Sequence, residues 1–292
     1  MTETNFDIVI PLFKPRWNTR ATMEGLTQHY APRSIHIITP ATEVETLTAL
    51  VKTWATAPIT VHNEDTFFQA KTGLSKADIC AELDLGESLY NPGWFYQQLL
   101  KLGAFEGIPE LSEWYLVWDS DLLPIATWPA ITTDVATGAT QHAFALIQHK
   151  NWGNPAIVGK WATWIQTILG VEPASDTAGT FVPHHMWFKQ AHLQTFAARV
   201  HQFFASEDHW LQLLMRSPNQ FGTFSEYWAY VSWVAAQAPD DLSFYPYADY
   251  GETSERFFDD GTGRFSAALR QFHGLAADTA ISPSYAQVST FI

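Results

Sequence analysis

The 292-residue sequence has few cysteines, few cations and no long apolar run. Its single cysteine, Cys80, excludes an intramolecular disulfide and indicates a reducing compartment. Sixteen Lys and Arg against 30 Asp and Glu give a formal charge of −14, which argues against nucleic acid or an anionic membrane surface as a partner. No run of about 18 apolar residues could span a membrane. The polar, acidic start MTETNFD also differs from a signal peptide. We therefore expect a cytoplasmic protein.

Apolar and aromatic residues are plentiful. A hydrophobic content of 47 % and an aromatic content of 15 % predict a globular fold. The 13 tryptophans exceed the needs of a core, so we expect some of them to form exposed platforms for sugar rings, which have one apolar face. The chain shows no internal repeat and no low-complexity linker. We expect one continuous domain over residues 1–292, with a change of composition near residue 125.

Short apolar runs alternate with helical patterns along the first 120 residues. Strands are expected at 7–12, 34–40, 59–62 and 114–118, and helices at 18–31, 42–55 and about 94–104. This alternation predicts an α/β fold with a mostly parallel sheet covered by helices. Residues 66–90 have no clear period and suggest a mobile excursion. Beyond Pro124 we expect strands at 141–148 and 179–188, and helices at 156–169, 189–204, 207–215 and 224–237.

Two carboxylates follow the apolar strand 114–118, in the sequence Asp119-Ser120-Asp121. Carboxylates are rarely buried unless they are paired or bind a cation, and two of them so close together repel each other. Hard oxygen ligands suit Mg²⁺ or Mn²⁺, which share their coordination shell with waters and substrate phosphates. Our hypothesis is a divalent metal on Asp119 and Asp121 that binds a diphosphate. The alternative is a surface turn, where Asp and Ser are also favoured.

Cations and amides lie near the ends of the predicted strands. Lys14 and Arg16 follow the first strand at its carboxyl end, where open α/β sheets bind ligands, so they are candidate diphosphate or base contacts. Ordinary solvated loop charges are the alternative. Gln98 and Lys101 lie on the polar face of the helix 94–104. They either point into a cleft beside the two aspartates or belong to a solvent face.

Histidines and one glutamate complete the candidates. His184 and His185 are adjacent, so on a strand their side chains point to opposite faces and only one can face a cleft. A zinc site has little support, because no H-x-x-x-H or C-x-x-C spacing is present. Thr223 and Glu226 fit a capping box for the helix 224–237. Alternatively, Glu226 projects into the cleft as a general base.

Several motifs together resemble a known group of enzymes. They are I-V-I-P, N-P-G-W-F-Y-Q-Q-L-L-K-L, Y-L-V-W-D-S-D, F-V-P-H-H-M-W-F and F-S-E-Y. Over roughly residues 6–250 the chain looks like a little-characterised group of small GT-A type glycosyltransferases. These nucleotide-sugar-dependent enzymes occur in surface-polysaccharide pathways and in large DNA viruses. The resemblance implies a GT-A type, Rossmann-like mixed sheet, with a nucleotide-sugar-binding half over about 1–124 and an acceptor-binding half over about 125–292.

The resemblance also implies roles for individual residues. A Mn²⁺ or Mg²⁺ ion would bind Asp119 and Asp121, and His273 is the nearest match to a late histidine that completes the metal shell in some GT-A enzymes. The residues assigned to a nucleotide-sugar donor, UDP by analogy or GDP, are Pro11, Lys14, Arg16, Gln98, Lys101, Trp118 and Ser120. Those assigned to the donor sugar or a saccharide acceptor are His184, His185 and Tyr227. Glu226 would be the base of an inverting transfer.

Two other functions remain open. The first is a sugar-binding module without turnover, which uses tryptophan platforms. The second is a phosphatase of the haloacid-dehalogenase type, whose nucleophile also lies in an hhhhD-x-D motif at a strand end. That motif has Thr or Val two residues after the second Asp, where this sequence has Leu123, and helical cap signals are missing. A serine hydrolase is disfavoured, because no G-x-S-x-G elbow is present.

Overall fold

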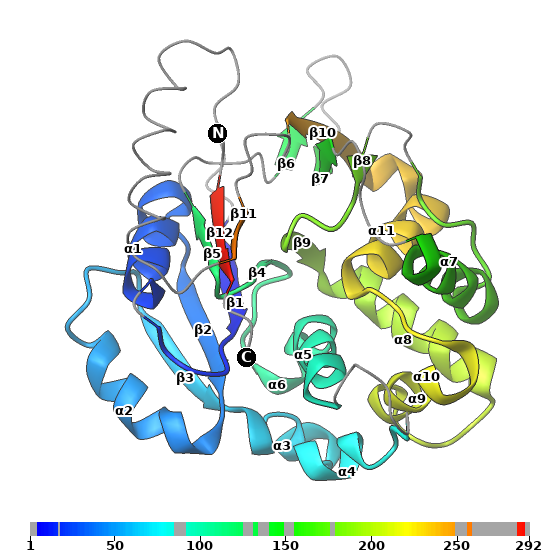
Figure 1. Cartoon of the computed structure of the whole chain (residues 1–292), viewed down its shortest axis with the longest axis horizontal. Helices are drawn as coiled ribbons and strands as arrows, with labels where there is room; N and C mark the ends of the chain where they lie inside the picture. Colours follow the sequence, from blue (N-terminus) through cyan, green and yellow to red (C-terminus); the bar gives the residue numbers. More distant parts are fainter. Residues whose placement is uncertain are drawn as a thin grey trace.

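Figure 1 shows the computed structural model of the chain. It describes residues 5–16, 18–84, 92–124, 131–133, 140–148, 155–175, 179–248, 256–258 and 285–289. The chain starts in the sheet and helices on the left of Figure 1 and continues into a mainly helical region on the right.

The central sheet has the strand order β3-β2-β1-β4-β9 within the described residues. Its strands are β1 (Asp7–Pro11), β2 (Ser34–Thr39), β3 (Ile59–Asn63), β4 (Trp114–Trp118) and β9 (His185–Lys189). The first four are parallel, and β9 pairs with β4 antiparallel at the edge. The predicted α/β fold, with a mixed, mostly parallel sheet between helices, is confirmed.

Each face of this sheet packs against its own helices. On one face, Ile8, Ile37 and Leu116 pack with side chains of α1 (Thr19–Tyr30) and α2 (Ala41–Val51). On the other face, Val9 and Val117 pack with a larger cluster. The helices of that cluster include α5 (Pro92–Leu102), α8 (Gln190–Phe204), α9 (Trp210–Arg216) and α11 (Glu226–Gln237). Burial on both faces explains why these strands read as continuous apolar runs.

The remaining elements are short. They are the helices α3 (Gln69–Thr72), α4 (Lys76–Cys80), α6 (Ala104–Gly107), α7 (Pro155–Trp164) and α10 (Pro218–Phe221), the 3₁₀ turns Glu64–Thr66 and Pro239–Asp241, and a π-helical turn, Ile165–Leu169. A second sheet has the order β10-β7-β6, with β8 beside β7, and a third has the order β11-β12-β5. These strands are β5 (Leu122–Pro124), β6 (Ile131–Thr133), β7 (Thr140–Gln148), β8 (Gly179–Thr180), β10 (Leu242–Ala248), β11 (Arg256–Phe258) and β12 (Tyr285–Ser289).

The interpretation of residues 66–90 as a mobile excursion is wrong for the part that the structure describes, up to residue 84. Two short helices, α3 and α4, occupy it. Ser75 and Asp78 form a reciprocal capping box at the start of α4, so the local sequence does fix a helix there. Four- and five-residue helices are too short to show the apolar periodicity from which longer helices are predicted.

Two aromatic side chains lie away from the positions expected of ligand contacts. Trp118 is fully buried among Ile and Leu side chains of the α1 and α2 face, and its Nε1 donates to the Leu122 carbonyl at 2.6 Å. His185 pairs with Trp118 across β9 and β4, and the two ring centroids are 4.8 Å apart. Burial lowers the pKa of His185 to about 3, so it is a neutral packed side chain.

The expected tryptophan platforms are not found among the described residues. Six of the described tryptophans are buried, and Trp54, Trp94, Trp114 and Trp161 are half-buried. The described tryptophans therefore serve mainly as core side chains. None of the helices in the described parts of the chain is long and apolar enough to cross a bilayer.

Removing the Trp118 side chain should leave a large cavity between the sheet and α1. We expect Trp118→Ala to lower the free energy of unfolding by about 3–5 kcal/mol, measured by urea denaturation. Phe13→Ala is the control: its side chain is 67 % exposed, and its removal should change the free energy of unfolding by no more than about 0.5 kcal/mol. Equal losses in the two variants would contradict the assignment of Trp118 to the core.

Candidate functional site

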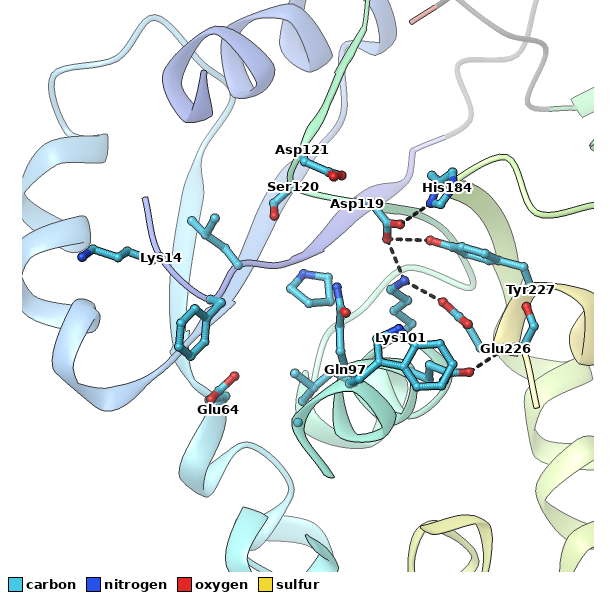
Figure 2. A pocket seen from close by; sticks show the side chains of 18 of the residues that line it. Lys14, Glu64, Gln97, Lys101, Asp119, Ser120, Asp121, His184, Glu226 and Tyr227 are labelled. Atoms are coloured by element: carbon cyan, nitrogen blue, oxygen red, sulfur yellow. Dashed lines mark hydrogen bonds and ion pairs between the residues drawn. The ribbon is translucent and has the colours of Figure 1, made fainter. Parts of the chain in front are cut away.

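A pocket of about 700 Å³ opens at the carboxyl ends of β1 and β4. From β1 the chain moves outward through β2 and β3, and it then returns to the other side of β1 to form β4. The crevice between such strands is the position where open α/β sheets bind ligands. Leu12 and Lys14 follow β1 into this pocket, and Asp119 and Asp121 follow β4 (Figure 2).

Asp119 contacts three other side chains of the pocket. It is 8 % exposed. Its Oδ1 lies 2.6 Å from the Lys101 Nζ and accepts a hydrogen bond from the Tyr227 hydroxyl at 2.9 Å, while its Oδ2 lies 3.0 Å from the His184 Nδ1. Burial raises the pKa of Asp119, but the Lys101 ammonium and the His184 contact outweigh burial and hold it well below its usual range. Asp119 is therefore a buried anion.

Lys101 supplies the countercharge. Its Nζ is 2.6 Å from the Asp119 Oδ1 and 2.6 Å from the Glu226 Oε1, and it lies 4.6 Å from the centroid of the Tyr227 ring. Burial lowers the pKa of this lysine, but the two carboxylates raise it above its usual value. With an exposed fraction of 4 %, Lys101 is a fixed cation and not a solvent-face lysine.

Glu226 is the first residue of α11 and is 6 % exposed. The predicted capping box is wrong, because the buried Thr223 Oγ1 has no hydrogen-bond partner among the described residues. The N-cap residue is Ser225, without a side-chain cap. The Glu226 carboxylate instead binds Lys101, and its backbone N–H donates to the Gln98 Oε1 at 3.0 Å. The partial positive charge at the helix N-terminus also favours a carboxylate there.

Only one of the two adjacent histidines enters the pocket, as expected, but strand alternation is not the reason, because β9 begins at His185 and His184 precedes it. His184 has φ = 63°, a left-handed backbone conformation that is uncommon for a residue other than glycine. Its carbonyl accepts a hydrogen bond from the Asp119 N–H at 3.0 Å, and its ring reaches the Asp119 carboxylate. His184 therefore joins the pocket, whereas His185 is packed on the opposite face.

The structure brings most of the predicted site residues to one pocket. Those that line it are Pro11, Lys14, Arg16, Gln98, Lys101, Asp119, Ser120, Asp121, His184, Glu226 and Tyr227. Trp118 and His185 do not line it, and their prediction as ligand contacts is corrected by their burial in the core. His273 lies outside the described residues.

The sequence analysis missed a second charged pair in the pocket. Glu64, in the turn after β3, forms an ion pair with Lys76 of α4. The rule that selected Lys14 applies equally to Glu64, because both follow a parallel strand at its carboxyl end. Lys76 carries no comparable signal, since it lies on a short helix in the segment without a clear period. The half-buried Trp94 and Trp161 also line the pocket.

The carboxylate oxygens of the pocket suit a metal cation that is also bound by a phosphate, but they do not form a complete metal-binding site by themselves. No group of three or more metal-ligating side chains occurs within the described residues. The two carboxylates after β4 are nevertheless hard oxygen ligands. Mg²⁺ is commonly bound by one or two carboxylates together with substrate phosphates and waters. Asp121 lines the pocket next to Asp119, which is itself held by three side chains.

Replacing Lys101 should leave two buried carboxylates without their shared countercharge. We expect Lys101→Met to lower the free energy of unfolding by about 3–5 kcal/mol in urea denaturation at pH 7. The control is Lys189→Met, which removes the partly exposed ion pair with Asp241 and should cost about 0–1 kcal/mol.

The same variant should reverse the pH dependence that Asp119 contributes. In the wild type, the lowered pKa of Asp119 stabilises the fold above about pH 4 and ceases to do so as the pH falls below that value. In Lys101→Met, burial is no longer opposed by the ammonium and should outweigh the remaining His184 contact, so the pKa of Asp119 should rise and stability should fall as the pH rises through the raised pKa. The difference in free energy of unfolding between the two proteins should therefore shrink as the pH falls from 7 to 4, and it should shrink further below pH 4. A difference that is constant between pH 4 and pH 7 would show that Lys101 does not compensate Asp119.

Comparisons with known proteins place the chain in a family without assigning an activity. No curated protein matches the sequence. The similar solved structures include mouse xyloside xylosyltransferase 1 in its apo form (11 % identity, TM-score 0.46, 83 % of this chain and 84 % of that one). They also include 4-diphosphocytidyl-2C-methyl-D-erythritol synthase from Anaerococcus prevotii (8 % identity, TM-score 0.41, 93 % and 97 %) and the glycosyltransferase GlyE of Streptococcus pneumoniae (10 % identity, TM-score 0.38, 98 % and 54 %).

These TM-scores lie below 0.5 and the identities near one residue in ten, so the likenesses give this chain neither a reaction nor a substrate. The family model is more extensive, because it matches residues 18–256, well over half of the chain. The protein therefore belongs to DUF6492, a family of unknown function.

Proposed function

We propose that this protein is a glycosyltransferase that moves a sugar from a nucleotide-diphosphate sugar to a saccharide hydroxyl. The observation that carries the proposal is the pocket at the ends of β1 and β4, which is lined both by Asp119 and Asp121 and by the cations Lys14 and Arg16. The pocket has about 700 Å³, within the range of roughly 300–1,000 Å³ that is typical of sites for small molecules.

The charges suit a diphosphate group. Lys14 and Arg16 form no ion pair within the described part of the chain, although both line the pocket. They are therefore available to an anion. Both follow β1, next to the strand that ends at Asp119, so one bound diphosphate could lie between the cations and the aspartates. Ser120 and the amide of Gln98 add polar groups to the same wall.

Mn²⁺ or Mg²⁺ is the cofactor we propose, held by Asp121 and Asp119 together with the diphosphate. When bound, such an ion stabilises the negative charge that develops on the departing diphosphate. Lys101 keeps Asp119 ionised and oriented. The cluster thus presents one fixed ammonium and two carboxylates at the point where the glycosyl–phosphate bond would break.

Glu226 is the general base that we propose for the acceptor hydroxyl. Its carboxylate is held by Lys101 through Oε1 on the pocket wall beside Asp119. Removal of the hydroxyl proton by Glu226 would accompany attack on the anomeric carbon from the face opposite the diphosphate, which inverts the configuration at that carbon. Tyr227, whose hydroxyl donates to Asp119, and His184 line the same end of the pocket, where the donor sugar and the acceptor would meet.

The two alternative functions fit the pocket less well. In a haloacid-dehalogenase-type phosphatase, Asp119 would be the nucleophile, but three side chains surround its carboxylate and it is 8 % exposed. A sugar-binding module without turnover relies on exposed aromatic platforms, and among the described tryptophans only the half-buried Trp94 and Trp161 line the pocket. Neither alternative explains two carboxylates that share one buried ammonium.

The donor and its cation can be tested together by thermal shift. With UDP and Mn²⁺ at about 100 times the dissociation constant, the wild type should gain about 2.7 kcal/mol, or roughly 5–10 °C. Asp121→Asn should lose most of this gain, because the amide removes one of the two carboxylates that we propose as cation ligands, while the ion pairs of Lys101 with Asp119 and Glu226 stay in place. GDP is measured in parallel.

Glu45→Gln is the matched control, since it removes one exposed carboxylate from α2 that does not line the pocket. It should retain the full shift. Full stabilisation of Asp121→Asn by nucleotide and Mn²⁺ would remove the metal from the proposal. The absence of any shift with UDP or GDP in the wild type would remove the nucleotide sugar as well.

Glu226→Gln tests the base. The amide cannot accept the acceptor proton, so the rate of sugar transfer should fall about 10²-fold or more. Binding of the nucleotide with Mn²⁺ should persist in this variant, and Glu45→Gln should transfer sugar at the wild-type rate. Transfer by Glu226→Gln at the wild-type rate would exclude Glu226 as the base.

A further inference from the structure

One charged pair of the pocket has no part in the chemistry proposed so far. Glu64, in the turn after β3, binds the ammonium of Lys76 from α4. Both side chains line the pocket, and Glu64 is 7 % exposed. The Glu64 Oε1 accepts a hydrogen bond from Lys76, whereas its Oε2 accepts none from the described residues. The pair therefore offers a carboxylate oxygen that can accept a hydrogen bond, next to an ammonium that can donate one.

Tyr96 holds this pair in place. Its hydroxyl donates to the Glu64 carbonyl at 2.8 Å, and the Lys76 Nζ lies 5.5 Å from the centroid of its ring. The Asn63 side chain accepts from the Asp65 N–H at 3.0 Å, which caps the turn that carries Glu64. A largely buried ion pair contributes little stability compared with apolar side chains. Fixed in this way on a pocket wall, the pair is suited to recognise a ligand.

An exposed aromatic ring lies at the same edge of the sheet. Phe13 is 67 % exposed, and of the three large apolar side chains that are exposed among the described residues it is the one that lines the pocket. Pro11, Ile38 and His62 are in register across β1, β2 and β3. Phe13 and Glu64 each come two residues after that row, so about two inter-strand spacings, roughly 10 Å, separate their backbones. A flat ring that stacks on Phe13 can therefore reach Glu64 with its edge.

The order of the strands sets the direction of a bound nucleotide. Its diphosphate is placed above at Asp119 and Asp121, which follow β4. In Figure 2, Glu226 and Tyr227 lie on one side of these aspartates and Glu64 lies on the other. The acceptor has to reach Glu226, so the nucleoside extends the other way. It then crosses the ends of β1 and β2 toward Glu64 at the end of β3.

Resting on the proposed function, we propose that Phe13, Glu64 and Lys76 form the subsite for the nucleobase. Glu64 accepts the ring N–H of uracil or guanine, Lys76 donates to the carbonyl oxygen beside that N–H, and the base stacks on Phe13. Both bases have a ring N–H next to a carbonyl oxygen, which complements a carboxylate next to an ammonium. Cytosine and adenine have a lone pair at the corresponding ring nitrogen, which the carboxylate would repel.

The test removes the N–H from the ligand and the acceptor oxygen from the protein. The ligands are UDP, UDP methylated at the uracil ring N–H, GDP, and GDP methylated at the guanine ring N–H. Their dissociation constants are measured by calorimetry with Mn²⁺. For the nucleotide that binds more tightly, methylation should weaken binding to the wild type at least tenfold, because a hydrogen bond to a charged group is lost. In Glu64→Ala the ratio of the two constants should fall toward one, since methylation then removes no hydrogen bond.

Inorganic pyrophosphate is the control ligand, because it carries a diphosphate without a base. Its affinity with Mn²⁺ should not fall in Glu64→Ala or in Phe13→Ala. Phe13→Ala should weaken the nucleotide about tenfold with or without the methyl group, since stacking needs no N–H. Glu45→Ala removes an exposed carboxylate that does not line the pocket, and it should leave every constant unchanged.

The outcomes separate the base subsite from the proposed function. If methylation has no effect in the wild type, or if Glu64→Ala leaves the ratio unchanged, the subsite is wrong and the proposed function stands, because the nucleotide still binds. A loss of pyrophosphate affinity in Glu64→Ala as large as the loss for the nucleotide would also overturn the subsite, as would wild-type nucleotide binding by Phe13→Ala. Binding of neither UDP nor GDP to the wild type would overturn the proposed function and the subsite together.

Discussion

The ion bridge that Lys101 makes between Asp119 and Glu226 is the interaction on which the pocket depends. It joins three elements that are distant in the sequence: α5, the carboxyl end of β4 and the start of α11. The pocket therefore draws on both predicted halves of the chain, since Asp119 lies before residue 125 and Glu226 after it. Removing the ammonium would leave each carboxylate without the charge that keeps it in place.

Such a bridge is a poor device for stability alone. Taking three charges out of water is expensive, and well-packed apolar side chains of similar volume are often as stable or more so. Position is what the bridge provides. The bridge fixes two carboxylates and an ammonium on the wall of a cavity. The Tyr227 hydroxyl donates a hydrogen bond to Asp119, and the side-chain amide oxygen of Gln98 accepts one from the Glu226 backbone N–H. Buried charges that are arranged in this way around a cleft are typical of functional sites.

The sequence predicts the sheet better than it predicts the pocket wall. Strands buried on both faces, such as β1 and β4, produce continuous apolar runs, and polar residues at their ends then mark the site. This reasoning placed Lys14, Asp119 and Asp121 at the pocket, and it applies equally to Glu64, which was overlooked. The resemblance, in contrast, assigned Trp118 to the donor, and this assignment is wrong because the Trp118 side chain points to the opposite face of the sheet and lies in the core.

Long-range pairs account for the remaining errors. Thr223 and Glu226 have the spacing of a capping box, and only the three-dimensional arrangement shows that Lys101, 125 positions earlier, binds the glutamate instead. The strong pairing of an ammonium and a carboxylate in a dry site outcompetes a cap, which contributes about 1 kcal/mol. No local pattern contains that information. The short helices α3 and α4 were missed for the opposite reason, since their signals are local but too brief to show a period.

His184 shows how the site departs from what the backbone alone would prefer. A left-handed conformation at a residue other than glycine costs of the order of 1 kcal/mol or more. Glycine at this position would avoid that cost, but it would leave the Asp119 Oδ2 without its imidazole partner. The Asp119 N–H holds the strained residue through the His184 carbonyl, and the His184 ring in turn holds the Asp119 carboxylate. Because the two residues fix each other by backbone and side chain, the strain at His184 is best explained as the cost of directing its ring into the pocket beside Asp119.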